Sequence, residues 1–212
     1  MSDSQLNTPE PIPEAESATA SPRKRPKPGE RRVQILQALA TMLEQPGAER
    51  ITTAALAARL EVSEAALYRH FASKAQMFEG LIEFIEQSVF TLVNQITERE
   101  SAGTAQAAKV VTMLLQFAEK NPGMTRVMVG DALVFENDRL QQRMNQFFDK
   151  IEATLKQSLR SAGDDSATPS ADAQVKASML TSFAVGRLQR FARSGFRRMP
   201  SEHLEASLAL ML

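Results

Sequence analysis

The chain has 212 residues, 43% of them hydrophobic and 24% charged, and its 25 Lys and Arg balance 25 Asp and Glu. This length can form one large domain or a small domain joined to a medium one, and the composition is typical of a globular protein. The absence of cysteine excludes disulfides, thiolate metal sites and cysteine nucleophiles.

The sequence offers little catalytic chemistry. The two histidines, His70 and His203, lie far apart in sequence, and neither has a metal-ligand neighbour three or four residues away. No glycine-rich phosphate loop or nucleophile elbow is present. We therefore expect no enzyme activity, no metal and no cofactor. The sequence also has no apolar run of membrane-spanning length and no secretory signal pattern at its start, which predicts a cytoplasmic protein that does not enter a membrane.

Residues 1–29 are predicted to form a disordered arm, because they are rich in Pro, Ser, Ala and Glu and nearly lack large apolar side chains. Four acids and no base occur in residues 1–21, whereas residues 22–74 carry ten Lys and Arg against five Asp and Glu. This local surplus of five positive charges on a neutral chain indicates a site for a polyanion.

The next segment predicts four closely spaced helices. Leu36, Leu39, Ala40 and Leu43 follow a helical period that stops at Pro46 and Gly47. Three helix starts then follow at Thr52, Ser63 and Ser73, each flanked by an apolar pair with the spacing of a hydrophobic staple: Ile51 and Leu56, Val62 and Leu67, Ala72 and Met77. Ser73 and Gln76 add a capping box. We expect short helices over residues 52–60 and 63–70, and a long helix from residue 73.

Beyond this segment the pattern predicts long helices. One apolar stripe contains Met77, Leu81, Phe84, Ile85, Val89, Leu92 and Ile96, and a second contains Val110, Leu114, Phe117 and Ala118. Further helices are expected over residues 134–160, 175–191 and 201–212, with a linker over 161–173. Since no strand-like alternation is found, the predicted fold is all-α. Its predicted parts are the arm 1–29, a domain of short helices over residues 30–75 and a larger helical domain over residues 76–212.

Residues 52–70 have the features of a helix-turn-helix, in which a short second helix is held firmly so that its outer face can enter the major groove of DNA. The predicted buried seam contains Leu56, Ala57, Leu60, Val62, Leu67 and Phe71. The same pattern leaves Glu64, Ala65, Tyr68 and Arg69 on the outer face. Short helices with solvated basic residues are common, but the staples, the spacing, the local charge and the basic arm all favour DNA binding.

The expected DNA contacts follow from residue type. Thr52, Thr53 and Ser63 can offer hydroxyl and backbone N–H groups to phosphates, and Tyr68, His70 and Lys74 also suit phosphate oxygens. Arg69 is the candidate for a bidentate contact to guanine, and Ala65 and Ala66 can lie against thymine methyl groups. The arm residues expected to follow the DNA backbone or enter a minor groove are Arg23, Lys24, Arg25, Lys27, Arg31 and Arg32.

The stretch "ITTAALAARLEVSEAALYRHFASKAQMF" resembles the DNA-binding domain of the TetR family, and the segments "EKNPGMTRVMVGDALVFENDRLQQRMNQFFDKIEA" and "RFARSGFRRMP" resemble the nucleoid occlusion factors of that family. The resemblance implies a homodimer that binds palindromic double-stranded chromosomal DNA, with higher-order assembly on DNA. It further implies antagonism of the cell-division protein FtsZ, with partner-binding residues Phe84, Lys120 and Asn121. Such a protein would be located at the nucleoid.

Alternatives stay open at several of these positions. Phe84 fits the apolar stripe and can belong to the core, and Asn121 before Pro122 reads as a helix N-cap. A symmetric interface is expected from the last two helices, where Leu180, Phe183, Ala184, Leu188 and Phe191 accompany Gly186, which permits close helix approach. The arginines from Arg187 to Arg198 suggest a solvated or interface face. A repressor that is released from DNA by a small ligand is the alternative function.

Overall fold

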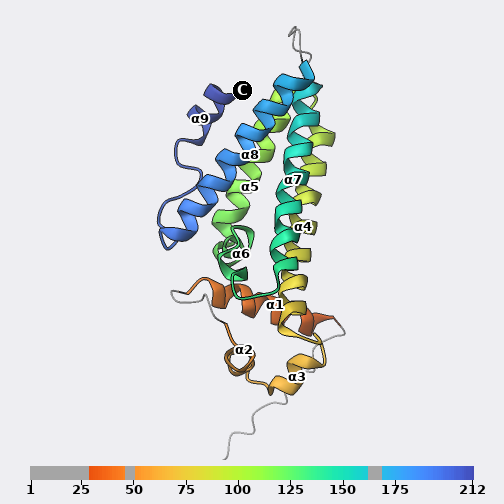
Figure 1. The fold of residues 1–212 in the computed structure, drawn as a ribbon, viewed down its shortest axis with the longest axis vertical. Helices are drawn as coiled ribbons and strands as arrows, with labels where there is room; N and C mark the ends of the chain where they lie inside the picture. The colour runs from red at the N-terminus through yellow and green to blue at the C-terminus, as the bar shows by residue number, and fades with distance from the viewer. Residues whose placement is uncertain (1–28, 46–50, 162–168) are drawn as a thin grey trace, which may run out of the picture.

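The structure, a computed structural model, describes residues 29–45, 51–161 and 169–212. All regular secondary structure in these ranges is helical, and the helices divide into a small cluster and a longer bundle (Figure 1). The elements are α1 (Glu30–Leu43), α2 (Thr53–Arg59), α3 (Glu64–Tyr68), α4 (Lys74–Arg99), α5 (Gly103–Lys120), α6 (Pro122–Met128), the 3-10 helix η2 (Asp131–Leu133), α7 (Asp138–Arg160), α8 (Pro169–Arg193) and α9 (Leu204–Met211). The all-α fold predicted from the sequence is confirmed over the described residues.

The three predicted helix starts in the small cluster are confirmed by their caps. The Thr52 side chain accepts the N–H of Ala55 (3.1 Å), and Ser63 accepts the N–H of Ala66 (3.3 Å). At the start of α4 Ser73 accepts the N–H of Gln76, which is the first half of the predicted capping box. The Gln76 side chain accepts the N–H of Ala72, the residue before the cap, and not that of Ser73. Ala72 itself is exposed, so these two hydrogen bonds and not a staple hold this third start.

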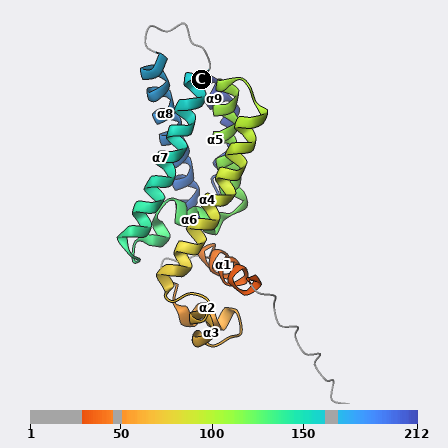
Figure 2. The same cartoon turned by 90° about the vertical axis from the view of Figure 1, so that its right-hand side faces the viewer.

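Helix α4 links the two parts of the molecule as one continuous rod (Figure 2). Its buried side comprises Met77, Phe78, Leu81, Ile82, Ile85, Val89 and Val93. The predicted stripe is therefore mostly correct, but Phe84 and Leu92 are 45% and 37% exposed. These two residues lie outside the core because no helix in the described ranges covers the side of α4 that carries them.

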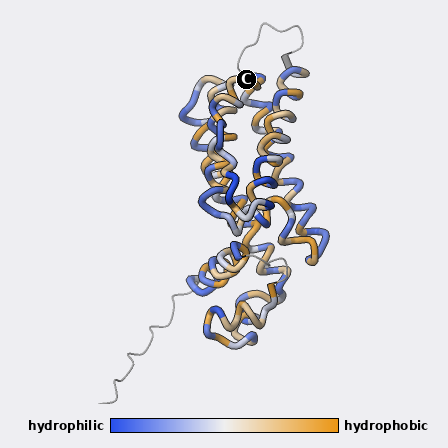
Figure 3. Tube along the Cα trace, turned by 90° about the vertical axis from the view of Figure 1, so that its left-hand side faces the viewer, coloured by the Kyte–Doolittle hydropathy of each residue, from blue (hydrophilic) through white to orange (hydrophobic). Residues whose placement is uncertain are grey.

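The larger part is a bundle of α4, α5, α7 and α8, with α9 lying alongside α8 (Figures 1 and 2). Edge-to-face contacts join Phe90 to Phe147 (5.6 Å between centroids) and Phe147 to Phe148 (5.1 Å), which fixes α4 against α7. Hydrophobic and hydrophilic residues alternate along the helices with the helical period (Figure 3). None of the helices in the described ranges is long and apolar enough to cross a membrane.

The small cluster is docked on the bundle through α1 and α6, which pack at the lower end of the bundle (Figure 1). Gly123 on α6 makes this approach possible, because a Cβ atom there would lie 1.9 Å from the carbonyl oxygen of Ala40 on α1. The position of the small cluster relative to the bundle is thus set by direct backbone contact.

Two predicted boundaries were wrong. Helix α7 begins at Asp138 and not at residue 134, since Gly130 (φ 84°) turns the chain into η2 and Asn137 caps α7 by accepting the N–H of Arg139 (3.0 Å). The predicted linker 161–173 is also too long, because α8 already begins at Pro169. Proline is well tolerated in the first turn of a helix, so its small and polar neighbours did not mark a loop.

Candidate nucleic-acid interface and partner surface

Helices α2 and α3 form the predicted helix-turn-helix. Leu56, Ala57, Leu67 and Phe71 are buried, and Leu60 and Val62 are partly buried against the same core. The N–H of Val62 donates to Ala57 O (3.0 Å), and Glu61 adopts a left-handed conformation (φ 54°) to make the turn. The predicted seam therefore fixes α3 to α2.

The outer face of α3 is open to solvent. Ala65, Arg69 and His70 are exposed, Tyr68 is 44% exposed, and Ala66 is half-buried. Arg69 caps the C-terminal end of α3, and no carboxylate within the described ranges pairs with it. A guanidinium in this position is available to a base edge or a phosphate.

The hydroxyl groups expected to contact phosphates differ in their present partners. Thr52 and Ser63 use their oxygens as caps, which leaves each O–H free to donate to a phosphate. Thr53 instead donates to Glu64 Oε2 (2.5 Å) and accepts from the Tyr68 hydroxyl (3.5 Å). Thr53 can therefore donate to DNA only after leaving Glu64.

Lys74, the expected phosphate clamp, already has an anionic partner. Its Nζ lies 2.5 Å from Oε1 of Glu136, which comes from the segment between η2 and α7, and the Glu136 side chain is only 10% exposed. Sequence reasoning missed this pair because the two residues are far apart in the chain. Lys74 would have to leave Glu136 before its ammonium group could pair with a phosphate.

Only Arg31 and Arg32 of the predicted basic arm are among the described residues. Arg23, Lys24, Arg25 and Lys27 lie outside the described residues. Arg32, expected in the same arm, belongs instead to α1, where Nη1 donates to His70 O (2.6 Å) and Cζ lies 4.1 Å from the centroid of the Phe71 ring. These contacts tie Arg32 to the residues that follow α3, and its expected contact with DNA stays a prediction. Arg31 donates to Gln34 on its own helix (2.9 Å).

The expected partner residues lie at two places on α4 and α5. Phe84 projects from the uncovered side of α4, so the alternative that it belongs to the core is wrong. Lys120 is exposed at the end of α5, next to Asn121. Asn121 holds the N-cap position before Pro122, but its Nδ2 donates backward to Phe117 O (2.7 Å) and its side chain makes no cap bond to α6. Asn121 therefore closes α5.

A small cleft of about 250 Å³ lies between α4 and α5 on this side, lined in part by Leu92, Ile96 and Met113. At its polar end Lys109 Nζ lies 2.6 Å from Oε2 of Glu100. The hydrogen bond from Lys109, together with the N–H of Ala102, lowers the pKa of the Glu100 carboxyl. The cleft is thus lined by apolar side chains along one part and by the Lys109–Glu100 ion pair at one end.

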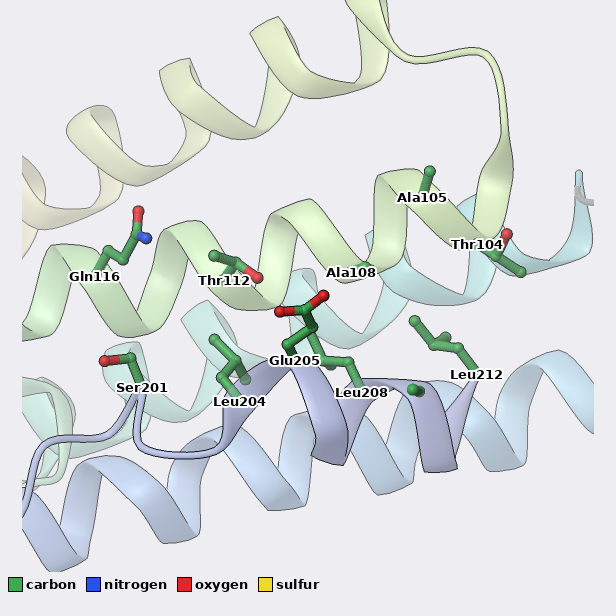
Figure 4. Close-up of a pocket in the computed structure, with 11 residues that line it drawn as sticks. Thr104, Ala105, Ala108, Thr112, Gln116, Ser201, Leu204, Glu205, Leu208 and Leu212 are labelled. Carbon is green, nitrogen blue, oxygen red and sulfur yellow. The ribbon is translucent and has the colours of Figure 1, made fainter.

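A larger open groove of about 650 Å³ separates α5 from α9. Thr104, Ala108 and Thr112 of α5 face Leu204, Leu208 and Leu212 of the C-terminal segment across it (Figure 4). This groove was not predicted, because it depends on how α9 folds back along the bundle. Its apolar walls suit an apolar ligand.

The expected dimer residues on α8 need correction. Leu180, Ala184, Leu188 and Phe191 are buried within the subunit, and Phe183 is partly buried. The exposed apolar side of α8 instead carries Val175 (59% exposed) and Met179 (50%), and a Cβ atom at Gly186 would meet nothing within 4 Å. This side of α8 is an apolar surface that a second copy can cover.

Comparison with known proteins places these features in a family. Residues 35–81 match the family described as "Bacterial regulatory proteins, tetR family", and residues 103–212 match the SlmA-like family described as "Tetracyclin repressor-like, C-terminal domain". The chain is 51% identical over 182 residues to the nucleoid occlusion factor SlmA of Idiomarina loihiensis, covering 85% of this chain and 93% of that protein.

Two further similarities agree with this assignment. SlmA of Escherichia coli O1:K1 / APEC is 50% identical over 186 residues, which cover 85% of this chain and 92% of that protein. A TetR transcriptional regulator from Legionella pneumophila shares the fold, with a TM-score of 0.69 and 16% identity over 90% of this chain and all of that one. The chain belongs to the TetR family of bacterial DNA-binding regulators and, within it, to the SlmA nucleoid occlusion factors.

Proposed function

We propose that a homodimer of this chain binds palindromic chromosomal DNA through α3 of each subunit and, while bound, antagonises FtsZ assembly over the nucleoid. The observation that carries the DNA-binding half is the outer face of α3, where Tyr68, Arg69 and His70 project into solvent from a helix whose inner face is buried. Twofold symmetry would present two such helices to half-sites about one DNA turn apart.

The FtsZ half of the proposal is supported by membership of the nucleoid occlusion factors and by the uncovered side of α4. Phe84 and Leu92 leave apolar surface open there, and the cleft between α4 and α5 adjoins Leu92. An exposed phenylalanine on the helix that also borders an apolar cleft is suited to hold a peptide segment of a partner. We assign Phe84, Lys120 and Asn121 to this contact.

The test measures FtsZ polymer mass by pelleting in the presence of GTP, with the protein alone and with a palindromic duplex selected by the protein from random DNA. DNA-bound protein should lower polymer mass more than free protein does. Phe84→Ala should abolish this effect without changing DNA affinity. Phe135→Ala, which alters another exposed phenylalanine (66%), is the matched control and should retain it. Unchanged polymers with DNA-bound wild-type protein would contradict the FtsZ proposal.

A second candidate, a repressor released by a small ligand, is favoured by the groove between α5 and α9. In that case the small-molecule fraction of a cell extract should release the protein from its palindrome, as followed by fluorescence anisotropy. Ala108→Phe, which fills the groove, should block the release. Release by that fraction together with intact FtsZ polymers would favour the repressor.

A further inference from the structure

The segment at the end of α8 gathers four arginines around one surface hollow. This hollow of about 370 Å³ is lined by Arg190, Arg193, Ser194, Arg197 and Arg198, and we name it the arginine hollow. All four guanidinium side chains are on exposed residues. Within the described ranges, no carboxylate lies at ion-pair distance from any of them. The hollow is therefore a concentrated positive site without an internal counter-charge.

The Ser194 side chain makes three hydrogen bonds to the backbone of this segment. The Ser194 hydroxyl donates to Phe191 O (2.9 Å) and accepts the N–H groups of Arg197 (3.0 Å) and Arg198 (2.9 Å). Gly195 and Phe196 both have φ of 63°, and for Phe196 this left-handed conformation costs about 1 kcal/mol or more. The turn brings Arg197 and Arg198 back beside Arg190 and Arg193.

Contacts with the bundle hold the same turn in place. The Phe196 ring packs edge-to-face on Phe191 (5.2 Å), and the guanidinium carbon of Arg126 on α6 lies 5.2 Å from the centroid of Phe196. Farther along, the N–H of Ser201 donates to Glu119 of α5 (2.9 Å). The arginines are thus presented by a turn tied to α5, α6 and α8.

Stabilisation of the helix end explains only part of this cluster. The C-terminus of a helix carries about half a negative charge, which favours basic residues in its last turn. Arg187 already has its own contacts, with the Phe183 ring (4.9 Å) and Ser207 (3.4 Å). Arg197 and Arg198 lie beyond the last residue of α8. The four positive charges of the arginine hollow together exceed the partial negative charge of the helix end several-fold. The surplus is available to an external anion.

We propose that the arginine hollow binds a small molecule that carries two or more phosphate groups. Guanidinium groups bind phosphate oxygens through paired, charge-assisted hydrogen bonds, and four of them offer more donors than one phosphate can accept. A compact hollow suits such a ligand better than a DNA backbone, which would need a continuous basic track. The residues that line the arginine hollow include none of those assigned to DNA on α3 or to FtsZ.

The test titrates inorganic tripolyphosphate into the full-length protein by calorimetry at about 0.15 M salt, where long-range attraction is screened. Wild-type protein should bind one tripolyphosphate per chain, and orthophosphate should bind much more weakly. Arg193→Ala with Arg197→Ala should weaken tripolyphosphate binding about tenfold or more. Lys150→Ala with Arg160→Ala, which removes two exposed charges of α7, should leave it unchanged. Equal loss in both double variants, or no saturable binding, would overturn the proposal.

Two further measurements separate a soluble phosphate ligand from other uses of the same arginines. Arg193→Lys with Arg197→Lys keeps the charge but loses the paired donors, so it should bind more weakly than wild type and more tightly than the alanine variant. Vesicles of phosphatidylglycerol or phosphatidylcholine should leave the protein in solution. Capture by the anionic vesicles without tripolyphosphate binding, or dissociation of the dimer in the alanine variant with tripolyphosphate binding intact, would overturn the proposal.

Discussion

Arg69, the C-terminal cap residue of α3, carries a guanidinium that can hydrogen-bond to a base edge, and its side chain is open to solvent. It stands at the C-terminal end of α3, is exposed, and has no ion-pair partner among the described residues. Its neighbours are already tied to the protein, since Thr53 bonds Glu64 and Lys74 pairs with Glu136. Base recognition is therefore expected to depend on Arg69 more than on these neighbours.

Arg69→Ala should reduce affinity for the selected palindrome about 10- to 100-fold and leave affinity for a scrambled duplex nearly unchanged, because a bidentate base contact is worth about 1–3 kcal/mol of discrimination. Fluorescence anisotropy at several salt concentrations measures both. Lys24→Ala is the contrasting variant: it should weaken both duplexes alike and reduce the salt dependence. Equal effects of the two substitutions on the two duplexes would contradict the assignment of Arg69.

Arg32 is expected to stabilise the folded protein through its contacts with His70 and Phe71. Arg32→Ala should lower the free energy of unfolding by about 1–2 kcal/mol, because it removes a charge-assisted bond to His70 O and a contact with the Phe71 ring. Thermal or urea unfolding measures the change. Arg31→Ala removes the same charge but only a bond to Gln34, so it should cost less. A larger loss from Arg31→Ala would contradict this role for Arg32.

At the scale of elements, α4 and α7 are joined by ion pairs along their length. Lys74 at the start of α4 meets Glu136 just before α7, and Glu86 of α4 meets Arg143 of α7 at 2.6 Å. The hydrogen bond that Arg143 donates to Glu86 raises the pKa of the Arg143 guanidinium. Only the first pair involves a residue expected to contact DNA, so only this pair should compete with a phosphate.

Glu136→Gln should therefore tighten DNA binding about two- to fivefold, because Lys74 no longer has to leave a carboxylate to reach a phosphate. Anisotropy at constant salt measures the change. Glu86→Gln is the control. It removes the same charge, from an ion pair between α4 and α7 that involves no expected DNA contact, and it should leave DNA affinity unchanged. An equal gain in both variants would show an effect of net charge alone and contradict the competition.

Helix positions were predicted well where the signal was local. The caps at Thr52, Ser63 and Ser73 act within three residues of their partners, so the sequence placed the starts of α2, α3 and α4 correctly. The start of α7 was missed because Gly130 and Asn137 interrupt an apolar pattern that continues on both sides. Periodicity alone does not show such an interruption.

At the scale of the whole molecule, the exposed side of α8 is expected to hold two subunits together. Val175, Met179 and the open surface at Gly186 lie on this side, while Leu180, Ala184, Leu188 and Phe191 are buried in the core of the subunit. An apolar surface of this kind, on a helix at the edge of the bundle, is typical of a subunit interface. The spacing of the two α3 helices on DNA depends on this contact.

Met179→Glu should place a charge in this surface and shift the protein toward monomer at micromolar concentration, as measured by sedimentation velocity. Binding to a full palindrome should weaken strongly, whereas binding to a single half-site should stay near the wild-type value. Ala153→Glu, at an exposed position of α7, is the control and should remain dimeric. A dimeric Met179→Glu protein would exclude this side of α8 as the interface.

The sequence by itself determined the helical fold, the helix-turn-helix and the outward direction of Tyr68, Arg69 and His70, because caps, staples and helical periods act between residues close in the chain. Tertiary structure alone decided the rest. It paired Lys74 with Glu136, brought Arg32 to His70 across 38 residues, left Phe84 uncovered and turned the expected dimer residues of α8 into core. These outcomes depend on which helices cover each face and which charges meet across the bundle. Such contacts join residues distant in sequence, so periodicity and capping carry no information about them.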